Sequence, residues 1–306
     1  MSRLTRANST KYAAPKTQPG NMAKKTALFL LVLTAFLWSS SGILIKNITW
    51  NPMALASARG LLAGLTIWFL NPGVFKPRSL QKMHFYAGGC LALLSVCFIS
   101  SMQLTAVANT VVLQFTAPIW VAIFAPLFLK ERTSLKDFVF IAIIFGGIIL
   151  FFVDKISPTG FWGNILAIVS GFFFASMAMC LRRLKDDSPV NAMIVGNLLC
   201  FAMGLGFWGP PWPDLVGIAC ILLLGFIQLG LSYHIYCLAL LRVSSLELVM
   251  VTMLEPVLSP LWVFLFMNEV PGPFALMGGF IVILAVTVWS LLKAKEETGL
   301  PAKALR

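Results

Sequence analysis

Charged residues are scarce in this sequence of 306 residues, at 11% against about 25% in an average soluble protein. Apolar residues make up 59%, and the mean hydropathy is +0.89. A chain with so few charges cannot surround a folded core with a water-facing surface. The composition therefore excludes an ordinary soluble domain and predicts an all-α membrane protein whose main solvent is lipid.

The groups that most enzymes use are also rare. The chain has 11 acidic residues and only two histidines, His84 and His234. It contains no H-E-x-x-H, no G-x-S-x-G and no phosphate-binding P-loop motif. The six cysteines lie singly in apolar runs without a C-x-x-C pair, as small hydrophobic residues do. We therefore expect no enzyme activity, no cofactor, no disulfide and no metal site.

Basic residues outnumber acidic ones and give a net charge of +12. They cluster in short loops and tails, which is typical of membrane-topology signals and not of a nucleic-acid-binding face. With a cytoplasmic N-terminus, all of them fall on the inner side except Lys46, Lys155 and the intramembrane Arg59. We expect both termini in the cytoplasm, in a bacterial inner (plasma) membrane, and no nucleic-acid partner.

Long hydrophobic runs fill most of the chain, and ten of them approach the length of about 20 residues that a spanning helix needs. Residues 1–25 are expected to be a disordered cytoplasmic tail, and residues 294–306 a second cytoplasmic tail. Turn residues separate most of the runs, whereas the connections near Gln103 and Arg242 must be tight hairpins. The ten predicted spans are Thr26–Ile45, Met53–Leu70, Met83–Met102, Ala106–Leu129, Leu135–Val153, Phe161–Leu181, Val190–Trp208, Asp214–Leu241, Ser244–Met267 and Phe274–Leu292.

The second half of the chain repeats the first. Residues 113–131 align with residues 251–269, so that Pro118 matches Pro256 and Glu131 matches Glu269. Each repeat, 26–154 and 161–293, holds five spans, and an odd number inverts the second copy in the membrane. Inverted repeats that hold a substrate between them near mid-bilayer are typical of secondary transporters. Duplication that only builds a stable bundle is the alternative.

These features resemble the drug/metabolite transporter superfamily, in particular its ten-helix EamA branch, over residues 27–293. The matching motifs run from Ala106 through Pro118 to Glu131, and from Leu254-Glu255-Pro256 to Asn268-Glu269; Trp38 and Arg59 match too. Many members have glycine where Lys130 and Asn268 stand. The resemblance implies two five-helix halves around a cavity bordered by spans three, four, eight and nine. It also implies transport, often export, of amino acids, metabolites or drugs.

Glu255 is the clearest candidate for coupling or binding. It lies 11 residues into the ninth span, about 16 Å along a helix and so near mid-bilayer. An ionisable group at that depth costs at least about 2.5–3.5 kcal/mol and marks function by default. Thr252 and Ser259 share its helix face. Proton coupling is one interpretation; a packing role beside the carbonyl freed by Pro256 is the other.

Further polar residues extend the candidate cavity. Gln114 aligns with Thr252, and Thr110 lies one turn earlier, so both halves would supply polar lining; interhelical hydrogen bonds alone would explain them as well. Arg59 can pair with a carboxylate or a substrate anion, but a packing role is favoured. Prolines in spans four and nine predict kinks, and hinge motion is a hypothesis. They are Pro118, Pro126, Pro256 and Pro260.

Aromatic and small residues complete the set of candidates. Tyr233, His234 and Tyr236 cluster on the eighth span with Gln228; His234 is either a proton relay or an ordinary hydrogen-bond partner. Trp38 precedes a run of small residues that is better explained as a packing face. The glutamates that end spans four and nine, Glu131 and Glu269, are either gating partners or solvated helix ends.

The sequence therefore predicts a secondary transporter, most simply an exporter, with alternating access around a polar cavity. Its partners are a small-molecule substrate, the lipid bilayer, and a proton or other coupling ion; a homodimer stays open beside a monomer. A channel or a non-transporting receptor is the alternative, and an intramembrane enzyme is a weaker one.

Overall fold

The computed structural model describes residues 22–105, 107–153, 159–258, 262 and 272–298, and within these ranges the fold is all-helical. Among the described residues, nine helical spans are long and apolar enough to cross a membrane; some of them consist of two or more consecutive helices. They match nine of the ten predicted spans, and the short α4–α5 and α11–α12 connections confirm the tight hairpins. The predicted ninth span is described only as far as residue 258 and at Trp262.

The helices are α1 (Lys24–Ser39), α2 (Ser41–Lys46), α3 (Pro52–Leu70), η1 (Pro77–Ser79), α4 (Lys82–Leu104), α5 (Val107–Gln114), α6 (Ala117–Phe128), α7 (Leu135–Phe152), α8 (Phe161–Arg183), α9 (Pro189–Gly204), η3 (Leu205–Phe207), α10 (Leu215–Leu223), η4 (Leu224–Leu231), α11 (Ser232–Leu240), α12 (Ser245–Thr252) and α14 (Pro273–Thr298).

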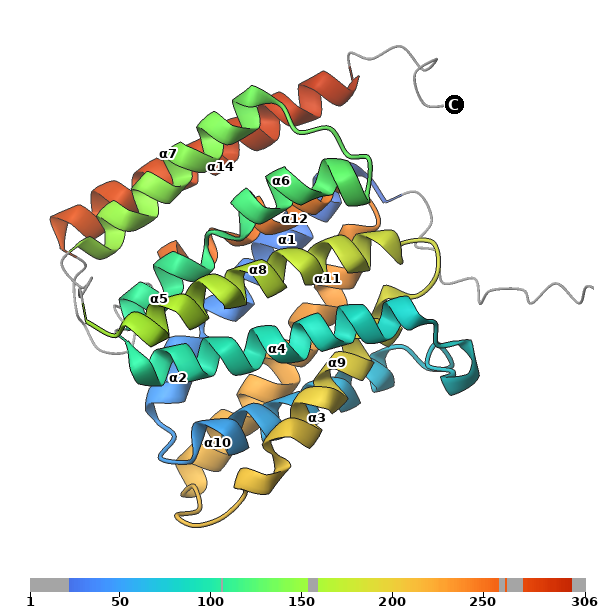
Figure 1. Cartoon of the computed structure of the whole chain (residues 1–306), viewed down its shortest axis with the longest axis vertical. Coiled ribbons are helices and arrows are strands. Elements are labelled where there is room, and N and C mark those ends of the chain that lie inside the picture. Colours follow the sequence, from blue (N-terminus) through green and yellow to red (C-terminus); the bar gives the residue numbers. More distant parts are fainter. Residues whose placement is uncertain (1–21, 106, 154–158, 259–261, 263–271, 299–306) are drawn as a thin grey trace, which may run out of the picture.

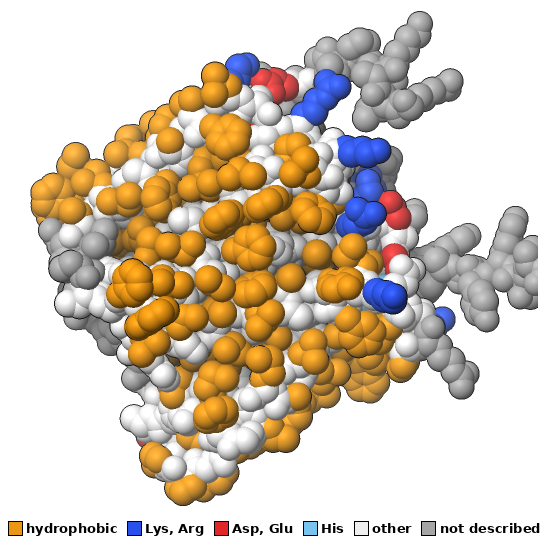
Figure 2. Space-filling view, in the orientation of Figure 1, with side chains coloured by type: hydrophobic (Ala, Val, Ile, Leu, Met, Phe, Trp, Pro, Cys, Tyr) orange, Lys and Arg blue, Asp and Glu red, His pale blue; other side chains and the backbone are white. Residues whose placement is uncertain are grey.

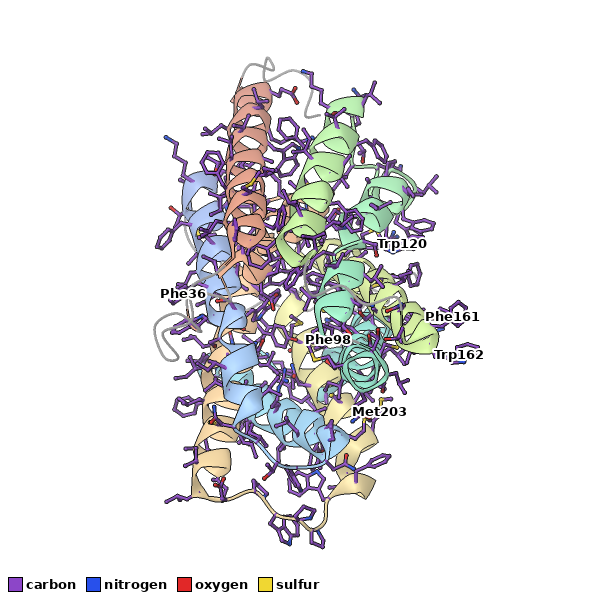
Figure 3. The ribbon with its side chains drawn as sticks, turned by 90° about the vertical axis from the view of Figure 1, so that its left-hand side faces the viewer. Phe36, Phe98, Trp120, Phe161, Trp162 and Met203 are labelled. Carbon is purple, nitrogen blue, oxygen red and sulfur yellow. The ribbon has the colours of Figure 1, made fainter. Side chains whose placement is uncertain are left out.

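The outer surface is apolar, whereas many buried side chains are polar, as expected of a protein whose solvent is lipid. Figure 2 shows hydrophobic side chains over the face in view, with Lys and Arg gathered along one edge. We call that edge the basic end; Lys24, Arg182 and Lys293 lie there. Phe161 and Trp162, at the start of α8, project outward near the opposite end (Figure 3), as interfacial aromatic residues do.

Helix packing follows the two-fold relation between the repeats. Pairs α3·α9 and α7·α14 each join a span to its own counterpart, and α4·α8 has its counterpart in α1·α11. The pair α7·α14 lies side by side at one margin of the bundle (Figure 1). Since α7 begins and α14 ends beside the Lys293–Asp137 ion pair, the two helices run antiparallel. The fold is thus a membrane bundle of two inverted five-helix repeats.

Spans four and nine are both broken at the same point of the repeat. The α5 helix ends at Gln114 and α6 starts at Ala117; α12 ends at Thr252, and the chain is helical again over residues 255–258. A proline follows each break, Pro118 in one repeat and Pro256 in the other. Proline has no N–H to donate to the preceding turn, so the helix restarts there. The kinks predicted from these prolines are therefore two-residue interruptions near mid-depth.

The chain turns sharply after α6, at the residue before Glu131. Lys130 has φ = 57°, in the left-handed region where a Cβ atom is strained. This turn directs the next residue, Glu131, across to the second repeat.

Replacing Lys130 with glycine should stabilise the protein. We expect Lys130→Gly to raise the free energy of unfolding by about 0.5–1 kcal/mol, because the relief of strain exceeds the added entropy of the unfolded chain. Thermal unfolding in detergent measures the change. Lys136→Gly, within α7, is the control and should be destabilising by about 1 kcal/mol. A lower melting temperature for Lys130→Gly would contradict this account.

Candidate functional site

Glu255 lies at the first position of the restarted helix in span nine, directly after the break. Its side chain is half-buried, and it interacts electrostatically with the guanidinium of Arg59 on α3. The start of a half-helix at mid-depth is the position at which broken-helix transporters hold charged groups. One carboxylate and one guanidinium, one from each repeat, thus lie within electrostatic range of each other inside the membrane.

Arg59 is held beside the second repeat by close backbone packing. The next residue, Gly60, meets the carbonyl oxygen of Asn197 on α9, and an added Cβ atom would lie 2.8 Å from it. The Nε of Arg59 is buried and has no hydrogen-bond partner in the part of the chain that the structure describes. An unsatisfied donor on a buried charged group costs free energy. Arg59 therefore has capacity to bind a further acceptor.

An aromatic wall adjoins this charge pair. The Trp38 ring of α1 lies 5.8 Å from the ring of Tyr233 and 5.6 Å from that of Tyr236, both on α11. Trp38 Nε1 donates to Ser232 Oγ at 2.7 Å, and this bond sets the ring orientation. Tyr233 also interacts electrostatically with Arg59 and Glu255. The candidate site thus combines one acid, one base and three aromatic rings from both repeats.

The other predicted polar residues lie away from this cluster. Thr110 is fully buried, and its hydroxyl lies 2.7 Å from that of Ser101 on α4. Thr252 donates to carbonyl oxygens of its own helix, and the backbone of Gln114 packs against Gly171 of α8.

His234 points to the other side of α11, where its Nδ1 lies 3.0 Å from Asn71 Nδ2. Ser259 and Glu269 lie outside the described residues. The cluster therefore draws on spans one, two, eight and nine, whereas the resemblance implied spans three, four, eight and nine.

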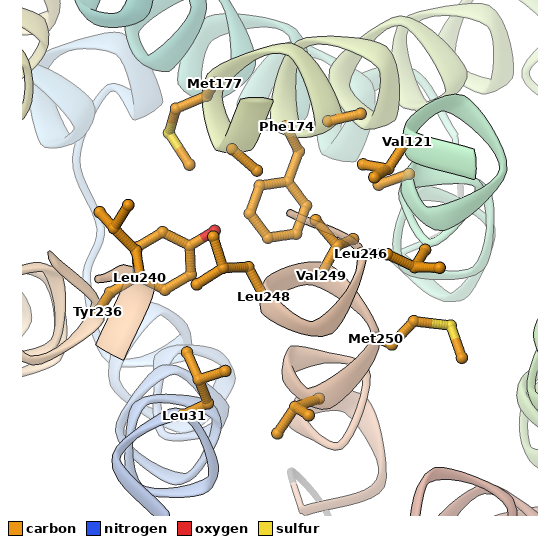
Figure 4. Close-up of a cluster of buried hydrophobic side chains, with 14 of the residues drawn as sticks. Leu31, Val121, Phe174, Met177, Tyr236, Leu240, Leu246, Leu248, Val249 and Met250 are labelled. Atoms are coloured by element: carbon orange, nitrogen blue, oxygen red, sulfur yellow. The ribbon is translucent and has the colours of Figure 1, made fainter. Parts of the chain in front are cut away.

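Apolar side chains close the route from this site to the basic end. Figure 4 shows Tyr236, Leu240 and Leu248 in one layer with Phe174 of α8 and Leu31 of α1. Tyr236, Leu240, Leu248 and Leu31 are fully buried, so this layer is closely packed. This layer lies between the charge pair and the basic loops.

A polar network seals the same end beyond that layer. Glu131 accepts from Arg182 Nε at 3.1 Å, and from Ser245 Oγ at 2.6 Å. Lys24 Nζ lies 2.6 Å from Glu247, whose other oxygen caps α12 through Ser244. Glu131 belongs to the first repeat and Lys24 begins α1, just before that repeat, whereas their partners belong to the second. We call these contacts the inter-repeat latch.

Glu131 was a candidate from the sequence, whereas its partners in the latch were not. The motif Ser244-Ser245-Leu246-Glu247 is a capping-box pattern, which predicts a helix start at this point. The pattern does not predict the partner of the Glu131 carboxylate, because Glu131 and Ser245 are 114 positions apart in the chain. Ser232, the partner of Trp38, was missed for the same reason.

Comparisons with known proteins agree with this architecture. The chain is 28% identical over 286 residues to an uncharacterized transporter of Archaeoglobus fulgidus, covering 87% of this chain and 97% of the relative. It is 23% identical to the pseudopaline exporter CntI of Pseudomonas aeruginosa, with 88% and 97% covered. A crystal structure of 16% identity superposes with a TM-score of 0.77, covering 88% of this chain and 99% of that one, and shows a shared fold.

A family model extends the agreement to both halves of the chain. The model of the EamA-like transporter family matches residues 25–153 and again residues 161–291. Two matches in tandem account for the duplicated architecture and for most of the sequence. The protein is therefore a multi-pass membrane protein that belongs to the EamA-like transporter family.

Proposed function

We propose that the protein is a proton-coupled secondary carrier that exports a small metabolite by alternating access. The observation that carries the proposal is the electrostatic interaction between Arg59 and Glu255, one charge from each repeat, beside the mid-depth break of span nine. Rocking of two inverted repeats would expose such a site to one side and then to the other. The basic end faces the cytoplasm in this proposal, in accord with the distribution of lysine and arginine.

The asymmetry between the two ends supports alternating access. At the basic end the apolar layer and the inter-repeat latch join the repeats, and a cavity of about 320 Å³ lies among the latch residues; a cavity of about 570 Å³ lies in the other half between α1, α2, α10 and η4. A carrier has to open one end only while the other is closed, and an open pore does not. We therefore favour a carrier that has its cytoplasmic end closed in this conformation.

Glu255 has the properties that a proton-coupling group needs. It is the acid of the charge pair, and binding a proton would remove its attraction to Arg59. That change would alter the contact between the repeats at the site itself. The exporter CntI is a relative with an established cargo, but its identity of 23% carries only the class of function to this chain.

Counterflow tests the carrier function directly. Metabolites are first compared in cells with and without the protein, and the solute that differs most is then used with purified protein in liposomes. A carrier should concentrate labelled solute into vesicles preloaded with unlabelled solute, and the rate should saturate. A non-saturating flux without counterflow would instead identify a channel, and no flux with any differing solute would reject transport.

A further inference from the structure

The half of the bundle opposite the basic end holds a cavity of about 570 Å³. It lies between α1 and α2 on one side and α10 and η4 on the other, with Trp262 of span nine on its wall. Its volume is in the usual range for a small-molecule site, about 300–1,000 Å³. Most of the described wall is apolar, including Leu223 and Ile227, and none of the described lining side chains carries a charge.

Each polar side chain on the described wall donates one hydrogen bond back to the protein. Ser40 donates to the Leu37 carbonyl oxygen at 2.7 Å, and Asn47 Nδ2 donates to the Ile43 carbonyl oxygen at 2.8 Å. Trp262 Nε1 donates to Ser39 Oγ at 2.8 Å. The oxygen atoms of Ser40 and Asn47 remain able to accept, so the cavity offers hydrogen-bond acceptors.

Gln228 provides the most buried of these acceptors. Its side-chain nitrogen lies 3.4 Å from the carbonyl oxygen of Trp38, which can only accept, so the amide is oriented with nitrogen toward Trp38. Gln228 is 4% exposed, and its Oε1 has no hydrogen-bond partner among the described residues. A buried amide oxygen without a donor is costly. It would be satisfied by a donor on a molecule in the cavity.

The backbone around Gln228 is unusual as well. Residues Leu224–Leu231 form a π-helix, a rare conformation that is found mostly at functional sites. The wider turn places Gln228 one turn before Ser232, the partner of Trp38 in the aromatic wall. The cavity is thereby joined to the candidate site through Gln228 and Trp38.

We propose that this cavity is an outward-facing solute subsite, through which the exported molecule leaves, and that it selects an apolar molecule whose head group donates hydrogen bonds, such as an amine or a hydroxyl, and rejects a carboxylate. The inference rests on the proposed carrier function and names its substrate class. A donor head group would bind Gln228 Oε1, while an apolar body would contact Leu223, Ile227 and the Trp262 ring. A carboxylate would place its charge beside acceptor oxygens in an apolar wall, and the described lining residues include no basic side chain to neutralise it.

Binding of matched indole probes to the purified full-length protein tests this selection. Tritiated tryptamine is the probe in a scintillation-proximity assay, and unlabelled tryptophol and indole-3-propionate are the competitors. The three share one ring system and differ in carrying an amine, a neutral hydroxyl or a carboxylate. We expect saturable tryptamine binding that tryptophol displaces and indole-3-propionate does not.

Substitution of the acceptor locates the site. Gln228→Leu should weaken tryptamine binding about tenfold, the effect of losing one hydrogen bond to a charged donor. Gln103→Leu, the same change at an exposed position of α4, should leave binding unchanged. Ser40→Ala removes a second acceptor without disturbing a buried amide and should weaken binding about threefold. It keeps the test decisive if Gln228→Leu misfolds.

Several outcomes would overturn the inference: no tryptamine binding to the wild type, displacement by indole-3-propionate as effective as that by tryptophol, or unchanged affinity in Gln228→Leu and Ser40→Ala. The proposed carrier function can be rejected independently of this inference about the cavity. If tryptamine binds through Gln228 but no solute shows counterflow, the subsite stands and transport is rejected; if another solute shows counterflow but tryptamine does not bind, transport stands and the subsite is rejected.

Discussion

Glu255→Gln is expected to abolish proton-driven accumulation of solute while leaving the protein folded. Liposomes with an acidic interior should accumulate the exported solute through the wild-type protein, because outward proton movement drives solute inward. The amide has nearly the same shape as the carboxylate but cannot take up or release a proton. Accumulation should therefore fall to the level of empty liposomes, whereas counterflow at equal pH on both sides, which needs no net proton movement, continues.

Two further variants separate coupling from packing at this position. Glu255→Asp retains a titratable group one methylene shorter and should keep part of the driven accumulation. Glu296→Gln makes the same chemical change at an exposed surface ion pair with Lys136 and should behave as wild type. Elution volume and melting temperature report on folding in each case. Unchanged driven accumulation in Glu255→Gln would remove this residue from coupling and leave it a packing role.

Cross-linking the inter-repeat latch should arrest transport. Glu131 Oε2 and Ser245 Oγ lie 2.6 Å apart across the two repeats at the basic end. If that end must open once per cycle, joining these positions covalently holds it shut. In a background without the six native cysteines, Glu131→Cys with Ser245→Cys, treated with a short bifunctional methanethiosulfonate that links the two thiols through disulfides, should lose counterflow at least about tenfold and regain it after reduction.

The matched controls are the two single-cysteine proteins treated with the same reagent. Each carries the modification without the bridge, so each should show the activity of its untreated form. Formation of the bridge is measured by mass spectrometry of the linked peptides. Full counterflow by the bridged protein would mean that this contact stays closed throughout the cycle, and the opening would have to be sought elsewhere.

The two halves of the molecule thus differ in the kinds of polar side chain that they contain. At the basic end, charged side chains bridge the repeats, because water and loops are near enough to solvate them when they separate. In the other half, uncharged acceptors line an apolar cavity, where a separated charge would be costly. Between them lies the Arg59–Glu255 pair, which takes one charge from each repeat. Movement of solute past that pair is the step on which the proposed coupling depends.

The sequence by itself determined the membrane class, the spans and the duplication. Lipid requires long apolar helices with internally satisfied backbones, so hydrophobic run length is nearly sufficient to find them. The breaks in spans four and nine were also predictable, because the effect of Pro118 and Pro256 is local. The choice of Glu255 needed only its depth along a helix. These inferences depend on distances along the chain, which the sequence states directly.

Only the tertiary structure decided which side chains meet. Arg59 and Glu255 are 196 positions apart in sequence, and helix rotation determines that they share a site. Rotation also turned Thr110 toward Ser101 and His234 toward Asn71, although their spacing matched a shared polar face equally well. A helix in an apolar bundle has apolar residues on most sides, so its pattern does not specify its rotation. Close packing between helices specifies it, and that packing is a property of the folded chain alone.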